Sequence, residues 1–433
     1  MNENDSQLIS GLMISAGYES CADAALADVI IVNTCCVRES AENRALGYIG
    51  SLKKLKQERP DVVICVTGCM AQKTGTSELL SKSYRHVGII TGTFASSRLP
   101  RYISEYEATG EPIIDIEERY DGEELIRSKE TSLAQGQTSW RAKVNINFGC
   151  NNFCSYCIVP YVRGRERSRV PVDIIQEVQS LAAGGVREIE LLGQNVNSYG
   201  KEFVCGQVDF AGLLQSLDRV EGIERIRYMT SHPRDLDQRL VETIVASRHV
   251  CRHFHLPVQS GCDRILDLMN RGYTTAKYKE KLAMIRSLCP DAVVTTDLIV
   301  GFPGETEDGF RQTLDFVSEC CFDAAYTFVY SRRSGTPAAK MQDQVEEKVK
   351  KERLLRLMAV QDPISLQINQ KMVGKKYEVM VEGQSKNDPS TFSGRTEGNK
   401  IVVFPNTRNY LPGDKCNVYI KEAKTWNLVG ELS

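Results

Sequence analysis

The middle of the chain, from about residue 141, alternates short apolar runs with amphipathic stretches. The apolar runs predict six buried strands, at residues 143–148, 188–193, 225–230, 253–256, 292–300 and 324–330. The amphipathic stretches predict helices near residues 173–183, 209–217, 236–246, 263–288 and 308–319. Strands that alternate with helices favour a parallel α/β sheet, either open or closed like a barrel. We expect this central domain to span residues 139–369.

The first 104 residues carry a second α/β pattern. Short buried strands are predicted at residues 29–32, 62–66 and 87–91, which is typical of a Rossmann-like domain. The stretch that follows, residues 105–138, is first acidic and then polar. Such a composition buries little apolar surface, so we expect a solvated linker there.

The last part of the chain changes pattern again, after a long charged helix predicted at residues 344–370. Short β-like runs follow at residues 376–381, 400–404 and 417–420, and glycine and proline separate them. About 65 residues of short strands predict a small β-barrel, which we assign to residues 370–433. From Lys371 onwards ten Lys and Arg stand against seven Asp and Glu. This mild basic excess is consistent with RNA binding.

Composition places the protein among ordinary globular chains. It has 433 residues, of which 42% are apolar and 25% charged, and a net charge of −2. The charge is too small to indicate a nucleic-acid or membrane partner for the chain as a whole. We find no run of 18 apolar residues and no signal peptide, and therefore expect a cytoplasmic protein without a membrane partner. In that reducing compartment the 15 cysteines indicate metal ligands and buried thiols, not disulfides.

Three of those cysteines, Cys150, Cys154 and Cys157, lie within eight residues of one another. Iron–sulfur clusters are held by cysteine thiolates at such short spacings. A 4Fe-4S cluster with three protein ligands keeps one iron open, as catalytic metal sites do. The alternative is a structural zinc site with a distant fourth ligand. Zinc sites usually pair two Cys-x-x-Cys elements, and one such pair is present here, so the spacing favours iron–sulfur.

Polar segments follow four of the predicted central strands, at residues 193–197, 231–233, 257–261 and 301–305. Each alone is typical of an ordinary turn. Together they predict a ligand site, because chemistry in α/β barrels lies at the C-terminal ends of the strands. In the N-terminal domain Cys35 and Cys69 follow two predicted strands in the same way. They either share a metal at one sheet edge or are ordinary buried thiols, and the spacing does not decide between these.

The three-cysteine run, with an aromatic residue, Tyr156, before its last cysteine, resembles the radical S-adenosylmethionine (SAM) superfamily. That resemblance implies a partial six-fold (βα) barrel, which agrees with the six predicted strands. It also implies that SAM chelates the open iron and that reduction of the cluster releases a 5′-deoxyadenosyl radical. The residues that we expect to contact SAM are Tyr156, Gln194, Asn195, Gln259 and Glu305.

Nearly the whole chain resembles the tRNA methylthiotransferases of the MiaB type. The resemblance rests on Asn33-Thr34-Cys35, Gly68-Cys69-Met70-Ala71-Gln72, the run that begins Cys157-Ile158-Val159-Pro160-Tyr161, and His255-Leu256-Pro257-Val258-Gln259. Around Gly394-Arg395-Thr396 the C-terminal part resembles a TRAM domain, an RNA-binding module.

The family implies two 4Fe-4S clusters, one on Cys150, Cys154 and Cys157 and an auxiliary one on three N-terminal cysteines. Cys35 and Cys69 match two of these. The third would precede Met1 by two residues, from which we expect that the natural chain begins further upstream. Cys36 and Cys65 are alternative ligands. Cys36 is adjacent to Cys35, an awkward position for a second ligand, and Cys65 lies inside a strand pattern.

The reaction that the family implies is the addition of a methylthio group to carbon 2 of isopentenyl-adenosine, beside the anticodon of tRNA. One SAM would supply the methyl group and a second the radical. The implied partners are the tRNA anticodon stem-loop, an electron donor of the flavodoxin or ferredoxin type, and an iron–sulfur or sulfur donor. Four arginines are candidates to bind RNA: Arg163, Arg165, Arg167 and Arg395. Pairing with neighbouring acids is the alternative for the first three.

Two sister activities remain open, because they share all three domains. One methylthiolates an aspartate of a ribosomal protein, and the other acts on threonylcarbamoyl-adenosine in tRNA. A third alternative is a non-catalytic iron–sulfur protein that binds RNA. The open cluster position and the polar segments at the strand ends argue against it.

Overall fold

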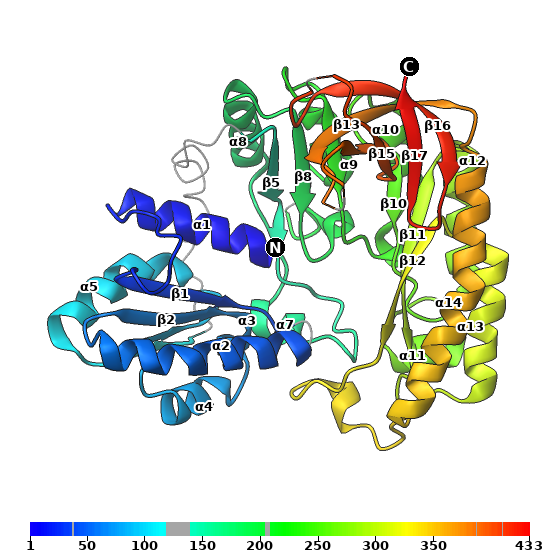
Figure 1. The fold of residues 1–433 in the computed structure, drawn as a ribbon. Helices are drawn as coiled ribbons and strands as arrows, with labels where there is room; N and C mark the ends of the chain where they lie inside the picture. The colour runs from blue at the N-terminus through cyan, green and yellow to red at the C-terminus, as the bar shows by residue number, and fades with distance from the viewer. Residues whose placement is uncertain (37–38, 118–138, 204–207, 387, 409) are drawn as a thin grey trace. The chain divides into compact units, whose positions relative to one another are not determined.

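The computed structural model describes residues 1–36, 39–117, 139–203, 208–386, 388–408 and 410–433 (Figure 1). The chain forms two compact units, which are described separately. The first comprises Met1–Gln137, Phe148–Arg167 and Ser331–Ala339, and the second Thr138–Asn147, Ser168–Tyr330 and Lys340–Ser433. Among the described residues, no helix combines the length and the apolar character needed to cross a membrane.

The first unit is built on a parallel sheet whose four strands follow one another in chain order. They are β1 (Val29–Thr34), β2 (Val63–Gly68), β3 (Ile89–Thr91) and β4 (Ile113–Asp115). Helices α1 (Asn2–Ser15), α2 (Glu39–Glu58), α3 (Cys69–Gln72), α4 (Thr76–Ser83), η1 (Ser96–Arg98), α5 (Leu99–Thr109) and α7 (Val159–Arg163) belong to the same unit. Every residue of β2 is buried, as a strand covered on both faces requires.

The three strands predicted in the N-terminal domain are confirmed, but the predicted linker starts too early. The end of α5 and the whole of β4 lie after residue 104. β4 has three residues and pairs with Ile89–Thr91 of β3, so it is too short to give an alternating pattern in the sequence. The acidic and polar run from residue 118 lies outside the described residues.

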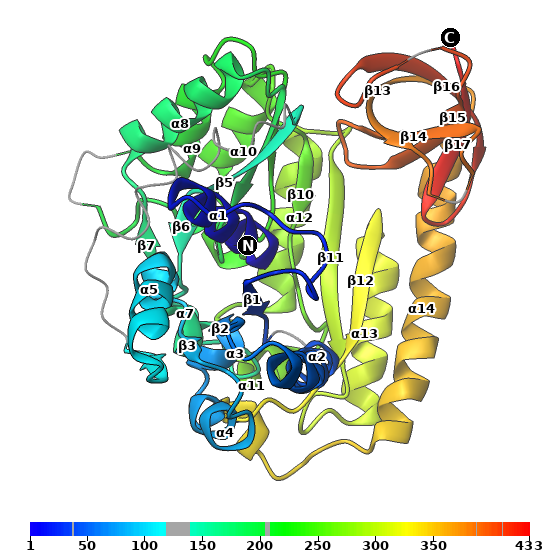
Figure 2. The same cartoon turned by 60° about the vertical axis from the view of Figure 1, so that its left-hand side comes forward.

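The second unit contains six parallel strands in chain order, which confirms the predicted partial barrel (Figure 2). Strands β5 (Arg141–Asn145), β8 (Glu188–Leu192) and β9 (Arg225–Tyr228) form one sheet, and β10 (His253–His255), β11 (Val293–Val300) and β12 (Ala324–Val329) another. A parallel bridge between Ile226 and Val250 joins the two sheets. The helices of this region are α8 (Pro171–Ala183), η2 (Val196–Ser198), α9 (Phe210–Leu217), η3 (Pro233–Asp235), α10 (Gln238–Ala246), α11 (Asp263–Leu268), α12 (Thr275–Leu288) and α13 (Glu307–Cys320).

One long helix predicted at residues 263–288 is wrong, because two helices, α11 and α12, occupy this stretch. The chain leaves the helical conformation at Asn270 and Gly272, whose φ angles are +56° and +69°. Asparagine and glycine adopt this left-handed conformation at the least cost.

A closed barrel of five strands ends the chain, as predicted for this region. After α14 (Glu347–Gln370) come β13 (Lys376–Gln384), β14 (Thr391–Thr396), β15 (Ile401–Pro405), β16 (Lys415–Ala423) and β17 (Asn427–Leu432). The sequence did not predict β14 or β17. In β14 the inward positions include Gly394 and Thr396, so its buried face lacks the apolar alternation that marks a strand.

This C-terminal barrel packs against the N-terminal ends of the first three strands of the six-strand barrel, in the same unit. Arg225, the first residue of β9, is ion-paired with Glu378 of β13 at 3.2 Å. Arg227 donates hydrogen bonds to the main-chain oxygens of Thr396 and Glu397, each at 3.0 Å. These contacts of the C-terminal barrel are all at one end of the six-strand barrel. They do not cover the other end, where the strands of α/β barrels carry their chemistry.

Candidate functional site

The loop of residues 149–158, called the cysteine loop below, carries Cys150, Cys154 and Cys157. Its entry requires glycine, because Gly149 has a φ of +70° and a Cβ there would lie 2.1 Å from the Arg165 oxygen. The loop is curled by two main-chain hydrogen bonds. The Cys150 N–H donates to Gly164 at 3.2 Å, and the Cys157 N–H donates to Cys154 at 2.9 Å.

The three thiols of the loop are a suitable donor set for a cluster. Cys150 and Cys154 are buried and Cys157 is half-buried. Burial, with a smaller contribution from the Cys157 and Cys154 thiols, raises the pKa of Cys150 to about 12. A bound metal reverses this, since a coordinated thiol loses its proton outright.

The described residues contain no group of three or more His, Cys, Asp or Glu side chains arranged around one metal-ion position. Each thiolate of a 4Fe-4S cluster binds a different iron, so its ligands need not converge on a single point. The three thiols of the loop remain the predicted ligands of a cluster.

Cys35 and Cys69 lie at the same edge of the N-terminal sheet, as predicted from their strands. The last residue of β1, Thr34, is in register with Gly68 of β2, and the two cysteines follow directly. Cys69 is buried, and Cys35 is partly exposed.

Cys36 contacts Cys69, which the sequence did not predict. The Cys36 thiol is buried and hydrogen-bonded to the Cys69 sulfur. This hydrogen bond, together with the Arg163 guanidinium, lowers the pKa of Cys69 to about 6. Cys65, by contrast, lies fully buried in the middle of β2, as its strand pattern indicated.

The arginine run after the cysteine loop divides into buried and exposed members. Arg163 is ion-paired with Asp5 at 2.6 Å, and 11% of its side chain is exposed. Arg169 is buried and paired with Glu177 at 2.6 Å. That Arg163 binds RNA stays a prediction, and in the first unit its guanidinium is paired with Asp5.

The two remaining arginines of the run lie over aromatic rings. Arg165 is exposed, 4.5 Å from the centre of the Phe153 ring, and Arg167 is half-buried, 5.3 Å from the centre of the Phe94 ring. Both remain candidates for RNA binding.

In the second unit, buried polar atoms without hydrogen-bond partners among the described residues gather where strands end. Asn195 follows β8; its Nδ2 donates to Asp235 at 2.6 Å, and its Oδ1 has no partner. Gln259 follows β10 with a φ of +74°, and its Oε1 has no partner either. Further buried atoms without a hydrogen-bond partner are the Asn145 Oδ1, both amide atoms of Asn197 and the His232 Nε2.

An unsatisfied buried polar group costs about 1–3 kcal/mol, so a set of them at one end of a barrel indicates a polar ligand. SAM carries amino, carboxylate and hydroxyl groups that suit such a set. Asn145 and Asn197 were not singled out from the sequence. Asn197 lies inside a polar segment that the sequence analysis did single out. Asn145 ends an apolar run and has no local signal.

Glu305 has a different environment from the other predicted SAM ligands. Its carboxylate accepts a hydrogen bond from the Gly301 N–H at 2.7 Å and is paired with Arg353 at 2.8 Å. Burial raises the pKa of Glu305. These contacts hold the loop after β11 against α14. Gln194 and Tyr156 are half-buried, and for both the contact with SAM stays a prediction.

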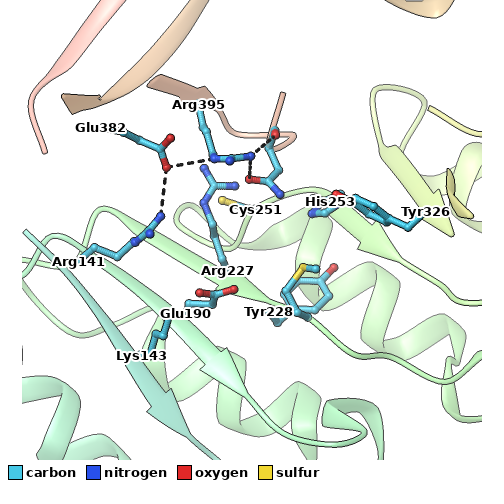
Figure 3. Close-up of a pocket in the computed structure, with 12 residues that line it drawn as sticks. Arg141, Lys143, Glu190, Arg227, Tyr228, Cys251, His253, Tyr326, Glu382 and Arg395 are labelled. Carbon is cyan, nitrogen blue, oxygen red and sulfur yellow. Dashed lines mark hydrogen bonds and ion pairs between the residues drawn. The ribbon is translucent and has the colours of Figure 1, made fainter. Parts of the chain in front are cut away.

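A polar cavity of about 270 Å³ lies where the C-terminal barrel meets the six-strand barrel (Figure 3). Glu382 there accepts hydrogen bonds from Arg141 at 3.2 Å and from Arg395 at 3.1 Å. Arg395 also donates to the side-chain oxygen of Asn399 at 3.2 Å, and 30% of its side chain is exposed. Arg395 is therefore held by its neighbours but still reaches the surface.

Three parts of the chain match known families. Residues 1–92 match the "Uncharacterized protein family UPF0004", residues 144–317 the Radical SAM superfamily, and residues 370–433 the TRAM domain. These matches follow the order of the Rossmann-like sheet, the six-strand barrel and the C-terminal barrel.

Curated relatives match over the full length of the chain. A tRNA-2-methylthio-N(6)-dimethylallyladenosine synthase of Pelotomaculum thermopropionicum is 48% identical over 433 residues, which are 100% of this chain and 95% of the relative. Proteins with the same name from Moorella thermoacetica and Desulforamulus reducens are 50% and 46% identical. Both alignments cover 100% of this chain, with 96% and 93% of the two relatives.

Proposed function

Because the chain belongs to the radical SAM family of tRNA-2-methylthio-N(6)-dimethylallyladenosine synthases, we propose that it adds a methylthio group to carbon 2 of dimethylallyl-adenosine in tRNA. The observation that carries this proposal is the sequence identity of 46–50% along the whole chain to relatives of that one name. The three buried or half-buried thiols of the cysteine loop are the chemical feature that supports it.

Cys150, Cys154 and Cys157 would hold a 4Fe-4S cluster with one open iron. When bound, this cluster and SAM supply the radical chemistry that is needed to break an unactivated aromatic C–H bond. The protein positions the thiols through the turn at Gly149. Burial of Cys150 and Cys154 would limit the access of water to the cluster.

Asn195 and Gln259 would receive the polar groups of SAM. Each presents a buried amide oxygen that lacks a hydrogen-bond donor among the described residues. A donor such as the SAM amino group or a ribose hydroxyl would satisfy either oxygen. Glu305 would act indirectly, by holding the loop after β11.

A second, auxiliary 4Fe-4S cluster would lie on Cys35 and Cys69 at the edge of the N-terminal sheet. The register of β1 with β2 supports this, since both cysteines leave the sheet at the same level. Cys36 is an alternative ligand, because it is hydrogen-bonded to Cys69. A cluster at this place would hold the sulfur that is to be transferred.

The RNA partner would be the anticodon stem-loop that carries the modified adenosine. The C-terminal barrel with Arg395, together with Arg165 and Arg167, would provide cations for its phosphates. An electron donor of the flavodoxin or ferredoxin type and a sulfur donor would complete the reaction. A tRNA substrate also accords with the expected cytoplasmic location.

The test is an anaerobic assay of the reconstituted protein with SAM, a reductant and tRNA that carries dimethylallyl-adenosine. We expect 2-methylthio-dimethylallyl-adenosine in the nucleoside digest by mass spectrometry, and no product from Cys150→Ala. Methylthiolation of threonylcarbamoyl-adenosine, or of a ribosomal-protein aspartate, in place of this product would contradict the proposal. No SAM cleavage under any of these conditions would favour a non-catalytic protein.

A further inference from the structure

We infer that Arg163 and Asp5 position and electrostatically balance the auxiliary cluster, and that Arg163 ties the helix after the cysteine loop to Cys69. This inference rests on the proposed function, because it concerns the cluster proposed above at Cys35 and Cys69. It assigns to Arg163 a role inside the first unit in place of the RNA contact predicted from the sequence.

The contacts of Arg163 connect three separate segments of the chain. Its Nη2 donates to the Asp5 Oδ2 at 2.6 Å, across 158 positions of sequence. The same guanidinium is hydrogen-bonded to the Cys69 sulfur. Asp5 lies on α1, Cys69 opens α3, and Arg163 ends α7.

Helix α7 is a short and well-packed link between the two cysteine sites. It begins at Val159, two residues after Cys157, and has five residues. Ile158 and Val162 pack in one apolar cluster with Cys36, Cys69 and Met70. A movement of α7 would therefore disturb the surroundings of both Cys157 and Cys69.

Thr93 makes a second connection between the same two helices. Its hydroxyl donates to the Val162 oxygen of α7 at 2.5 Å. Its main-chain N–H donates to the Gln72 side chain of α3 at 3.1 Å. The spacing of α7 from the Cys69 helix is thus fixed by packing, by Thr93 and by Arg163.

Charge gives Arg163 a role beyond packing. Thiolate-ligated clusters are anionic, and a buried anion needs a nearby cation or donors. Arg163 supplies a positive charge and a hydrogen-bond donor to the Cys69 sulfur. Asp5 orients the guanidinium and offsets part of its charge. The reduction potential of an iron–sulfur cluster depends on net charge and on hydrogen bonds to its sulfurs.

Substitutions of Arg163 and of Asp5 should shift the reduction potential of the auxiliary cluster in opposite directions. Loss of the Arg163 cation makes the addition of an electron harder and lowers the auxiliary potential. Loss of the Asp5 carboxylate charge raises that potential. Arg165 is a matched control, because it lies two residues further on and is exposed over Phe153.

The experiment uses the protein with Cys150, Cys154 and Cys157 replaced by alanine, so that only the auxiliary cluster is loaded, with about four irons per chain. Its potential is measured by a redox titration followed by electron paramagnetic resonance. We expect a lower potential in Arg163→Met, a higher one in Asp5→Asn, and no change in Arg163→Lys or Arg165→Met. Unchanged potentials in both Arg163→Met and Asp5→Asn, or shifts of the same sign, would overturn the inference.

A second readout uses the same substitutions in the protein with both clusters. In Arg163→Met the packing of Ile158 and Val162 and the Thr93 hydrogen bond still hold α7 in place. We therefore expect this variant to cleave SAM to 5′-deoxyadenosine at the normal rate while methylthiolation falls at least tenfold. Equal losses of both activities would contradict a role at the auxiliary site. If Arg163→Met does not load its cluster, Asp5→Asn and Arg163→Lys decide by their potentials. Failure of the proposed function is recognised separately, since the unsubstituted protein would then load no auxiliary cluster or form no methylthio product.

Discussion

Arg141, the first residue of the six-strand barrel, donates a hydrogen bond to Glu382 of the C-terminal barrel at 3.2 Å. Glu382 also accepts from Arg395 of its own barrel, so one carboxylate joins an arginine from each (Figure 3). These contacts lie at the N-terminal ends of the strands, whereas Asn195 and Gln259 follow the C-terminal ends. An RNA bound to both barrels would therefore be held at a fixed distance from the proposed SAM site.

Substitution of Glu382 should loosen the C-terminal barrel and weaken tRNA binding. Because its ion pairs are partly exposed, we expect Glu382→Gln to lower the apparent free energy of unfolding by only about 1 kcal/mol. The KM for tRNA should rise several-fold, while SAM cleavage without tRNA stays unchanged. The control is Glu431→Gln, which removes an exposed partner of Lys421 on the same barrel and should change neither quantity. An equal effect of both substitutions on KM would contradict the specific role of Glu382.

Gln259 offers a test of the SAM site that separates binding from stability. Gln259→Met keeps the side-chain length and the backbone φ of +74° but removes the unpartnered buried oxygen. Replacing an unsatisfied polar group by an apolar one of similar shape is close to neutral for stability or raises it. We therefore expect an unchanged or higher melting temperature of the SAM-free protein, with a Kd for SAM about tenfold higher, equivalent to roughly 1.4 kcal/mol.

The control for Gln259 is Gln361 of α14, whose buried Oε1 likewise has no partner among the described residues. Its Nε2, however, donates to the Phe322 oxygen and to the Ser365 hydroxyl, each at 2.9 Å. Gln361→Met should lower the melting temperature and leave the Kd for SAM unchanged. A normal Kd in Gln259→Met would remove this residue from the site.

Glu305 should behave in the opposite way to Gln259. Glu305→Ala would remove the buried carboxylate that lies 2.8 Å from the Arg353 guanidinium and leave the longer pair with the exposed Glu307 at 3.6 Å. Breaking a buried ion pair costs about 3–5 kcal/mol. We expect a large loss of stability in chemical denaturation, while the folded fraction binds SAM with its normal Kd by calorimetry. A weakened Kd with normal stability would instead restore the direct SAM contact predicted from the sequence.

The extent to which the sequence predicted the fold depended on how local each signal was. The six strands of the central barrel and the charged helix before the C-terminal barrel have strong periodic patterns, and both were predicted. The break between α11 and α12 could also have been predicted, because Asn270 and Gly272 stand together in a helical pattern. Strand β14 could not, since its inward positions include Gly394 and Thr396 and are recognised only once the barrel has closed.

The same distinction applies to the site. The cysteine loop is read directly from the spacing of three residues, and the strand ends place Cys35 beside Cys69. The pairing of Arg163 with Asp5 joins residues 158 positions apart, and no local sequence pattern predicts it. The sequence therefore predicted a role in RNA binding for Arg163 but not its contacts with Asp5 and Cys69.

Gly149 should be indispensable for the cysteine loop. Both Gly149→Ala and Gly185→Ala place a side chain at a positive φ, which costs about 1–2 kcal/mol in either case. Only at position 149 would the new Cβ also meet backbone, the Arg165 oxygen at 2.1 Å, while Gly185 has open space. We expect Gly149→Ala to lose about four irons per chain after reconstitution and Gly185→Ala to lose none. Full iron loading of Gly149→Ala would show that the loop tolerates another conformation.

Iron counting on cysteine variants should identify the ligands of the auxiliary cluster. We expect about eight irons in the reconstituted protein and about four after Cys150→Ala or after Cys69→Ala. Cys35 and Cys36 are compared directly, because Cys36 is the one hydrogen-bonded to Cys69 while the family resemblance points to Cys35. The variant among these two that loses four irons identifies the ligand, and the other should lose none. Cys65→Ala is the control, since its thiol lies within β2 and should not affect the count. If neither Cys35→Ala nor Cys36→Ala lowers the iron content, the auxiliary cluster is not bound at the ends of β1 and β2.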